Sequence, residues 1–171
     1  TLWHTLSLHD ALPISWKKRF QEHFSQDTKL SDLSDKTLFS LAQPGEESAF
    51  AFYEFIMAVL DLGPGIKFNW LDKKDQLRVL DIHLFLADQV RFEMMRRLGW
   101  IEPLLCERYP LIKIIQEFDK IKSACEKHPP ELVDHHPKRD KYLELTDRDK
   151  EGFIRRLLPE ALEVFGKIAG G

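Results

Sequence analysis

The chain has 171 residues, of which 43% are hydrophobic and 31% charged, and its 25 Lys and Arg against 28 Asp and Glu give a formal net charge of −3. This composition excludes a disordered tail, a collagen repeat and a disulfide scaffold, and it gives no electrostatic reason to expect nucleic acid or an anionic membrane as a partner. No apolar stretch reaches the roughly 18 residues of a membrane-spanning helix.

The first segment, residues 1–14, is expected to be foreign to the protein. Its residues 5–14 look like one reading frame of a sequencing adaptor, because the codons ACT-CTT-TCC-CTA-CAC-GAC-GCT-CTT-CCG-ATC encode the same residues in the same order. The alternative interpretation is a genuine N-terminal arm of the protein. The remainder, 15–171, shows no internal repeat and no break in composition, so we predict that it forms a single domain.

Apolar residues at helical spacing predict helices along the rest of the chain. The first covers 16–24 and carries an aromatic residue at every fourth position. A second begins after Ser34, which is a favourable N-cap residue, and must end before Pro44. A third, over 46–62, is apolar on nearly every side, and this places it at the centre of the core.

The longest predicted helix covers 72–98 and ends at Gly99, which suits the left-handed position after a helix. The connection before it is short, so it should pack antiparallel to 46–62 as a central pair. At 100° per residue the helix has an apolar half and a polar half. The apolar half holds Leu77, Val79, Leu80, Leu84, Leu86, Ala87, Val90, Met94, Met95 and Leu98. The polar half holds Arg78, Asp81, Asp88, Gln89, Glu93 and Arg96.

The C-terminal third of the chain predicts two more helices. One covers 110–127, a Pro-containing surface loop follows over about 129–145, and the last helix covers 146–168, where Pro159 should kink or divide it. No run of alternating apolar residues is long enough for a sheet. The sequence therefore predicts an all-α fold, a compact bundle of five or six helices around the central antiparallel pair.

Glu54 and His83 form the first candidate site. Each lies roughly 12 Å from the connection between the two central helices, so their side chains should meet in the core. A buried carboxylate needs such a partner. One interpretation is a structural pair that fixes the register of the helices, and the other is a catalytic general acid–base pair or part of a metal site. Arg91 lies on the same half of its helix and should pair with Glu46 or Glu47.

The second candidate site is the loop over 128–136, His-Pro-Pro-Glu-Leu-Val-Asp-His-His. His128, Asp134, His135 and His136 are ligand types that zinc prefers. Their spacing matches no defined zinc motif, so a solvated loop with adventitious metal affinity is the alternative interpretation.

Three aromatic residues are candidates for binding a partner. Phe85 and Phe92 lie one helical repeat apart on the polar half of the long helix, and Trp100 follows its end. Aromatic side chains anchor many protein interfaces. We therefore predict that these three residues contact a protein partner, and the alternative is that they fill gaps between helices of the chain itself.

Other catalytic patterns are absent from the chain. It contains no Glu-x-x-His, no phosphate-binding Gly-rich loop and no Gly-x-Ser-x-Gly, so no cofactor is predicted. Cys106 and Cys125 form no Cys-x-x-Cys motif, and Cys125 lies on an apolar stripe, which predicts a buried thiol in a reducing compartment.

These observations favour a binding protein over an enzyme. We expect a small cytoplasmic bacterial protein that acts as a helical interaction or regulatory module. Its partner should be a protein, with a homodimer as one form of this, and neither nucleic acid nor a membrane is expected. The alternative is a metal-dependent or acid–base enzyme that uses Glu54 and His83 or the 128–136 loop.

Overall fold

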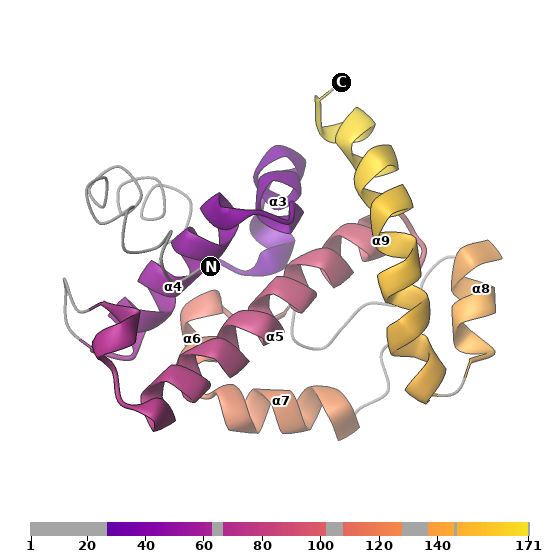
Figure 1. Cartoon of the computed structure of the whole chain (residues 1–171). Coiled ribbons are helices and arrows are strands. Elements are labelled where there is room, and N and C mark those ends of the chain that lie inside the picture. The colour runs from indigo at the N-terminus through magenta and orange to yellow at the C-terminus, as the bar shows by residue number, and fades with distance from the viewer. Residues whose placement is uncertain (1–26, 63–66, 102–107, 128–136, 146, 171) are drawn as a thin grey trace.

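The computed structural model describes residues 27–62, 67–101, 108–127, 137–145 and 147–170 (Figure 1). Within these residues the chain is almost entirely helical, and the β pairing is limited to an isolated bridge between Lys29 and Pro110. The predicted all-α fold is therefore confirmed. The adaptor-like segment and the predicted helix over 16–24 lie outside the described residues.

The first helices follow the local signals of the sequence. After the 3-10 turn η1 (Leu30–Asp32), α3 (Asp35–Ala42) begins at its predicted cap, because the Ser34 hydroxyl accepts the Thr37 amide hydrogen at 3.2 Å. The next helix, α4 (Glu46–Val59), begins where the third helix was predicted.

The longest helix, α5 (Lys73–Arg97), follows the 3-10 turn η2 (Phe68–Trp70). The Asp72 carboxylate caps it by accepting the Asp75 amide hydrogen at 2.8 Å, and Gly99 follows it with a φ of 74°. In Figure 1 α5 runs diagonally through the molecule, and it contacts α3, α4, α9 and η1. The predicted packing of α4 against α5 is confirmed, and α3 and α9 (Asp147–Gly170) join α4 around the same central helix.

Two predictions for the C-terminal third are wrong. The helix predicted over 110–127 is two helices, α6 (Leu111–Gln116) and α7 (Phe118–Lys127), because the backbone of Glu117 leaves the helical region at φ −112° and ψ 30°. The predicted surface loop contains a short helix, α8 (Pro137–Leu143).

The last helix, α9, runs undivided through Pro159. A proline inside a helix removes one backbone hydrogen bond and crowds the preceding turn. Phe153 on one side of Pro159 and Phe165 on the other are both buried in the core. Packing on both sides therefore holds the two halves of α9 in one continuous helix.

The core draws side chains from nearly every element. Its largest fully buried members include Leu30, Leu38, Ile56, Ile82, Leu86, Met94, Ile114, Phe118 and Phe165. They belong to one connected cluster of buried residues, which joins η1, α3, α4, α5, α6, α7 and α9.

The orientation of α5 differs from the prediction. Gln89 and Glu93, assigned to the polar half, are 6% and 2% exposed, whereas Leu77 and Leu84, assigned to the apolar half, are 57% and 61% exposed. The buried side of α5 is therefore turned by about a quarter turn around the helix axis from the predicted one. The cause is tertiary, since α3 and α9 pack against α5 and bury part of its polar half.

Candidate functional site

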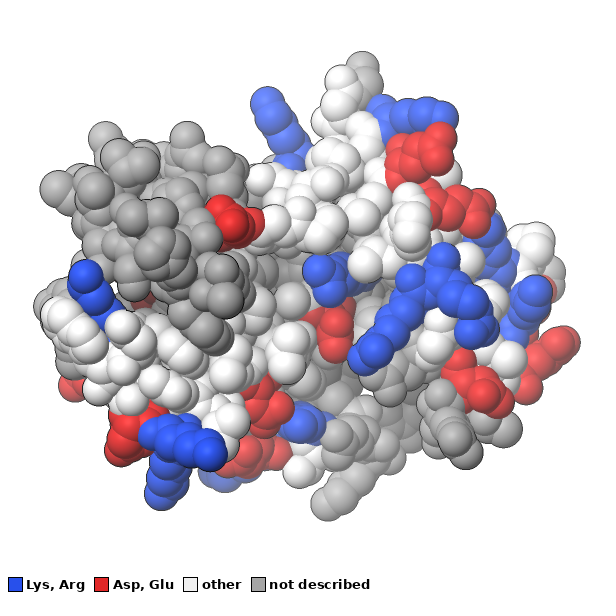
Figure 2. All heavy atoms as spheres, viewed as in Figure 1, with Lys and Arg blue, Asp and Glu red and all other residues white. Residues whose placement is uncertain are grey.

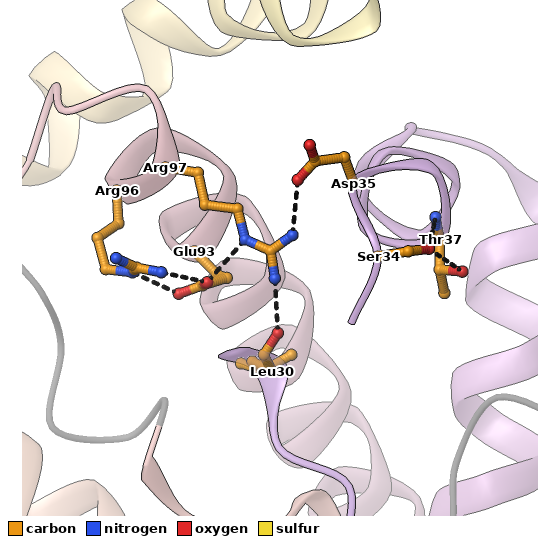
Figure 3. Close-up of polar contacts among 7 residues, drawn as sticks. All are labelled: Leu30, Ser34, Asp35, Thr37, Glu93, Arg96 and Arg97. Atoms are coloured by element: carbon orange, nitrogen blue, oxygen red, sulfur yellow. Dashed lines mark hydrogen bonds and ion pairs between the residues drawn. The ribbon is translucent and has the colours of Figure 1, made fainter. Parts of the chain in front are cut away.

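Glu93 is a buried carboxylate at the centre of a cluster of charged groups near the C-terminal end of α5 (Figure 3). Arg96 donates two hydrogen bonds to its carboxylate, from Nε to Oε2 at 2.8 Å and from Nη2 to Oε1 at 2.7 Å. Arg97 donates a third from Nε to Oε1 at 2.9 Å. A buried carboxylate is tolerated because these charge-assisted bonds satisfy its oxygens.

Arg97 extends this cluster to two other elements. Its Nη1 donates to the Asp35 carboxylate of α3 at 2.8 Å, and its Nη2 donates to the Leu30 carbonyl oxygen of η1 at 3.1 Å (Figure 3). We call Glu93, Arg96, Arg97 and Asp35 the arginine clamp. Its groups bind one another and join α5, α3 and η1, so we assign it a structural role.

His83 lies between α5 and α4, in contact with aromatic rings. Its ring is stacked on that of Tyr53, with centroids 4.5 Å apart and planes 10° apart, and it meets Phe52 edge-on at 5.8 Å. Burial, together with the positive charge of Arg91, lowers the pKa of His83 from 6.5 to about 4. The imidazole is therefore neutral at pH 7.

The predicted pairing of Glu54 with His83 does not form. Within the residues that the structure describes, no hydrogen bond or ion pair joins the two side chains, and His83 instead contacts Tyr53, one residue earlier on α4. Successive helical residues point about 100° apart, so the residue that faces α5 is Tyr53. Among the described residues, no bond therefore supports a Glu54–His83 pair, in either its structural or its catalytic interpretation.

Arg91 lies close to a carboxylate of its own helix. Its Nη1 is 3.9 Å from an Asp88 carboxylate oxygen, and its Nε is buried without a hydrogen-bond partner among the described residues. Of its two predicted partners, the side chain of Glu47 lies outside the described part of the chain, so the predicted pair stays a prediction. The positive charge of Arg91 helps to keep the imidazole of His83 neutral.

The three predicted partner-binding aromatic residues do not form an exposed patch. Phe85 packs edge-on against Phe118 of α7, with ring centroids 5.2 Å apart, and Phe92 is half-buried against the core. Trp100 is 5% exposed, and Lys138 of α8 places its Nζ 4.3 Å from the centre of the indole ring. All three contribute to packing between elements.

The predicted metal ligands His128, Asp134, His135 and His136 lie outside the described residues. Across the described ranges, no group of three or more His, Cys, Asp or Glu is arranged to hold a metal ion.

The prediction of a free thiol at Cys125 is wrong. Cys125 is half-buried and disulfide-bonded, while Cys106 lies outside the described residues. Disulfides are typical of oxidising compartments. The structure therefore gives no support to the reasoning that placed the chain in a reducing compartment.

An exposed apolar face of α5 is the feature that sequence reasoning missed. Leu77 and Leu84 are seven residues apart, so they lie one above the other on the helix. Lys73 lies one turn before them on the same side, and Asp88 and Arg91 follow one and two turns after. We call these five residues the α5 outer face.

The neighbouring helices leave this face uncovered among the described residues. On one side Arg78 of α5 binds Asp119 of α7 at 2.9 Å, and Asp81 lies 3.9 Å from Lys122 of α7. On the other side His83 contacts α4. Between these two contacts, Leu77 and Leu84 are exposed to solvent. Trp70, which lies just before the N-terminal end of α5, is 66% exposed.

The surface charge of the molecule is mixed. Figure 2 shows Lys and Arg side chains interspersed with Asp and Glu, including around the N-terminal end of α5 at the lower left of the view.

No helix in the described part of the chain is long and apolar enough to cross a membrane. Comparisons of the chain with protein-family models, with curated proteins and with solved structures gave no match.

Proposed function

We propose that this protein is a helical interaction module that binds a protein partner through the α5 outer face. The observation that carries the proposal is the exposure of Leu77 and Leu84 on a helix whose other sides are packed. Single exposed apolar residues are common on protein surfaces, but two large ones in line, with a tryptophan near the end of the row, form the kind of stripe that a partner helix covers.

The charges around the stripe favour a protein partner. Lys73, Asp81, Asp88 and Arg91 surround the two leucines with both signs of charge. An apolar centre with a mixed polar rim is typical of protein interfaces. Nucleic acid would instead require a continuous basic surface.

The proposal is tested by photo-crosslinking in cells that express the full chain. A benzophenone amino acid replaces Asp88, which is exposed at the edge of the α5 outer face, and in a matched control it replaces Ser40, which is exposed on α3. We expect the probe at Asp88 to form intermolecular adducts that the probe at Ser40 does not form. Replacing both leucines, as Leu77→Glu and Leu84→Glu, should abolish those adducts while the circular dichroism of the chain stays unchanged.

Three results would contradict the proposal. The probe at Asp88 could form no adduct, or it could form the same adducts as the probe at Ser40. It could also react only within its own chain, which would show that another segment of the protein covers the α5 outer face.

A further inference from the structure

We infer that the partner on the α5 outer face is a second copy of this chain, packed antiparallel through α5. This inference rests on the proposed function and names its partner. It follows from the order of apolar and charged residues along the face, which complements itself when one helix is reversed.

The leucines set the register of the two helices. If the twofold axis passes α5 midway between Leu80 and Asp81, Leu77 of each copy lies opposite Leu84 of the other. A symmetric dimer of this kind contains every contact twice, so two Leu77–Leu84 contacts form its centre. The four leucines that are most exposed in the separate copies are then buried together.

The same register pairs opposite charges. It places Lys73 of each copy opposite Asp88 of the other, one turn outside the leucines, and again the contact occurs twice. In a parallel arrangement Lys73 would face Lys73 and Asp88 would face Asp88, and like charges opposite each other are unfavourable. Charge complementarity therefore selects the antiparallel pair.

The ends and the middle of the face are compatible with this arrangement. Trp70 lies in η2 just before one helix begins, where it is 66% exposed and where the Lys67 ammonium lies 5.4 Å from the centre of its ring. The two Asp81 carboxylates approach each other near the axis, where the Lys122 ammonium of each copy, 3.9 Å from Asp81, offsets their repulsion.

The surface area that the two helices would bury determines the expected affinity of the dimer. One pair of helices buries less surface than a standard stable interface, so we expect a reversible dimer that forms at micromolar concentrations.

The antiparallel register is tested by cysteine cross-linking of the full chain. Two variants that differ in mass by a tag, Leu77→Cys and Leu84→Cys, are oxidised separately and as a mixture, with the unchanged chain as the control for its native cysteines. Positions 77 and 84 of opposite copies lie at the same level, whereas two copies of position 77 are separated by about 10 Å along the axis, which is too far for a disulfide. We expect a cross-linked dimer of mixed mass from the mixture and little cross-linking in either variant alone.

Charge reversal gives an independent readout by analytical ultracentrifugation. We expect Lys73→Glu alone and Asp88→Lys alone each to weaken dimerisation roughly tenfold, because each introduces two like-charge contacts. The double variant restores both pairs with reversed sign and should recover the dissociation constant of the unchanged chain.

Different experimental results would overturn the proposed function and the second-copy inference. A chain that stays monomeric at several hundred micromolar would overturn the second-copy inference, and so would cross-linking of each single variant to itself. The proposed function would survive that result if the probe at Asp88 still captured another protein in a manner that depends on Leu77 and Leu84. If that probe captures nothing and the unchanged chain stays monomeric, both proposals fail.

Discussion

The environment of His83 shows how a single side chain can carry a measurable pH dependence without catalytic chemistry. Its imidazole is enclosed by the rings of Tyr53 and Phe52, and Arg91 adds a positive charge nearby. Burial, which is the larger cause, and the charge of Arg91 lower the pKa of His83 in the folded chain to about 4, whereas in the unfolded chain it is near 6.5.

We expect this difference to destabilise the protein between pH 6.5 and pH 4. Below pH 6.5 the unfolded chain binds a proton at His83 that the folded chain binds only near pH 4, so unfolding becomes more favourable as the pH falls. Above pH 6.5 the imidazole is neutral in both states and contributes no pH dependence. Between pH 7.5 and pH 5 the free energy of unfolding should decrease by up to about 2 kcal/mol from this residue.

The measurement is urea unfolding at pH 7.5 and at pH 5, for the unchanged chain and for His83→Phe. Phenylalanine keeps an aromatic ring against Tyr53 and removes the titrating group. Carboxylates contribute equally to both proteins, so the difference between them isolates His83. An equal loss of stability in both proteins would show that His83 is not responsible.

Glu93 is the residue whose loss should cost most among the charged side chains described here. Replacement by alanine removes the carboxylate that accepts three hydrogen bonds from Arg96 and Arg97. Because Arg97 keeps its bond to Asp35 and both arginines are partly exposed, the cost should be about 2 kcal/mol, below that of a fully buried pair. We expect Glu93→Ala to lower the free energy of unfolding by about that amount, measured by urea unfolding at pH 7.5.

The matched control is Glu163→Ala on the exposed side of α9. Glu163 lies 3.6 Å from Lys167 in an ion pair that is open to water on both sides. Exposed pairs of this kind contribute about 0.5 kcal/mol or less. If both variants lose the same small amount of stability, the arginine clamp does not stabilise the fold.

At the scale of elements, the contact between α3 and α9 depends on a glycine, Gly166, which has no side chain. A Cβ added to Gly166 would lie 2.9 Å from Cζ of Phe39, whose ring also packs beside Phe165. Glycine is unfavourable in a helix, so replacement by alanine would ordinarily stabilise α9. Here we expect Gly166→Ala to destabilise the protein by about 1–3 kcal/mol, because the ring of Phe39 must move.

Gly152, also within α9, provides the comparison. A Cβ at Gly152 would meet only the flexible end of the Arg156 side chain, at 3.4 Å. Gly152→Ala should therefore stabilise the protein by up to about 1 kcal/mol. Thermal unfolding of the two variants should shift the melting temperature in opposite directions, and a rise in both would contradict the close packing of α3 and α9.

Local signals predicted the helix boundaries well. Ser34 before α3 and Gly99 after α5 act at the positions expected from their chemistry, because capping depends on a few neighbouring residues. The sequence has no proline or glycine at the break near Glu117, so no local signal predicted that the helix would end there. The missed helix α8 did carry a signal, because Pro137 is suited to a first helical position and was interpreted as part of a loop.

Which side of a helix is buried depends on its neighbours, and here sequence reasoning failed. The leucines of α5 outnumber its polar residues on one side, so that side was assigned to the core. The packing of α3 and α9 instead buries Gln89 and Glu93 and leaves Leu77 and Leu84 exposed. The pattern Glu93, Arg96, Arg97 at i, i+3 and i+4 was a usable signal for the arginine clamp.

At the scale of the whole molecule, the same error hid the candidate binding surface. The sequence predicts a partner surface at Phe85, Phe92 and Trp100, whereas the structure packs these residues against α7, the core and α8. Large apolar residues that looked buried were instead the exposed ones. The fold class could be predicted from periodicity alone, whereas the surface required knowledge of how the helices are arranged around α5.

The arginine clamp also bears on the order in which the molecule assembles. Arg97 reaches Asp35 across 62 residues and Leu30 across 67, so its bonds close long loops of chain. Such contacts form only after the segments between them have collapsed, since closing a long loop early costs entropy without compensation. The bonds of Arg97 to Asp35 and Leu30 should therefore form late in folding. Asp35→Ala, which removes the first of them, should unfold faster in stopped-flow experiments while it folds at nearly the rate of the unchanged chain.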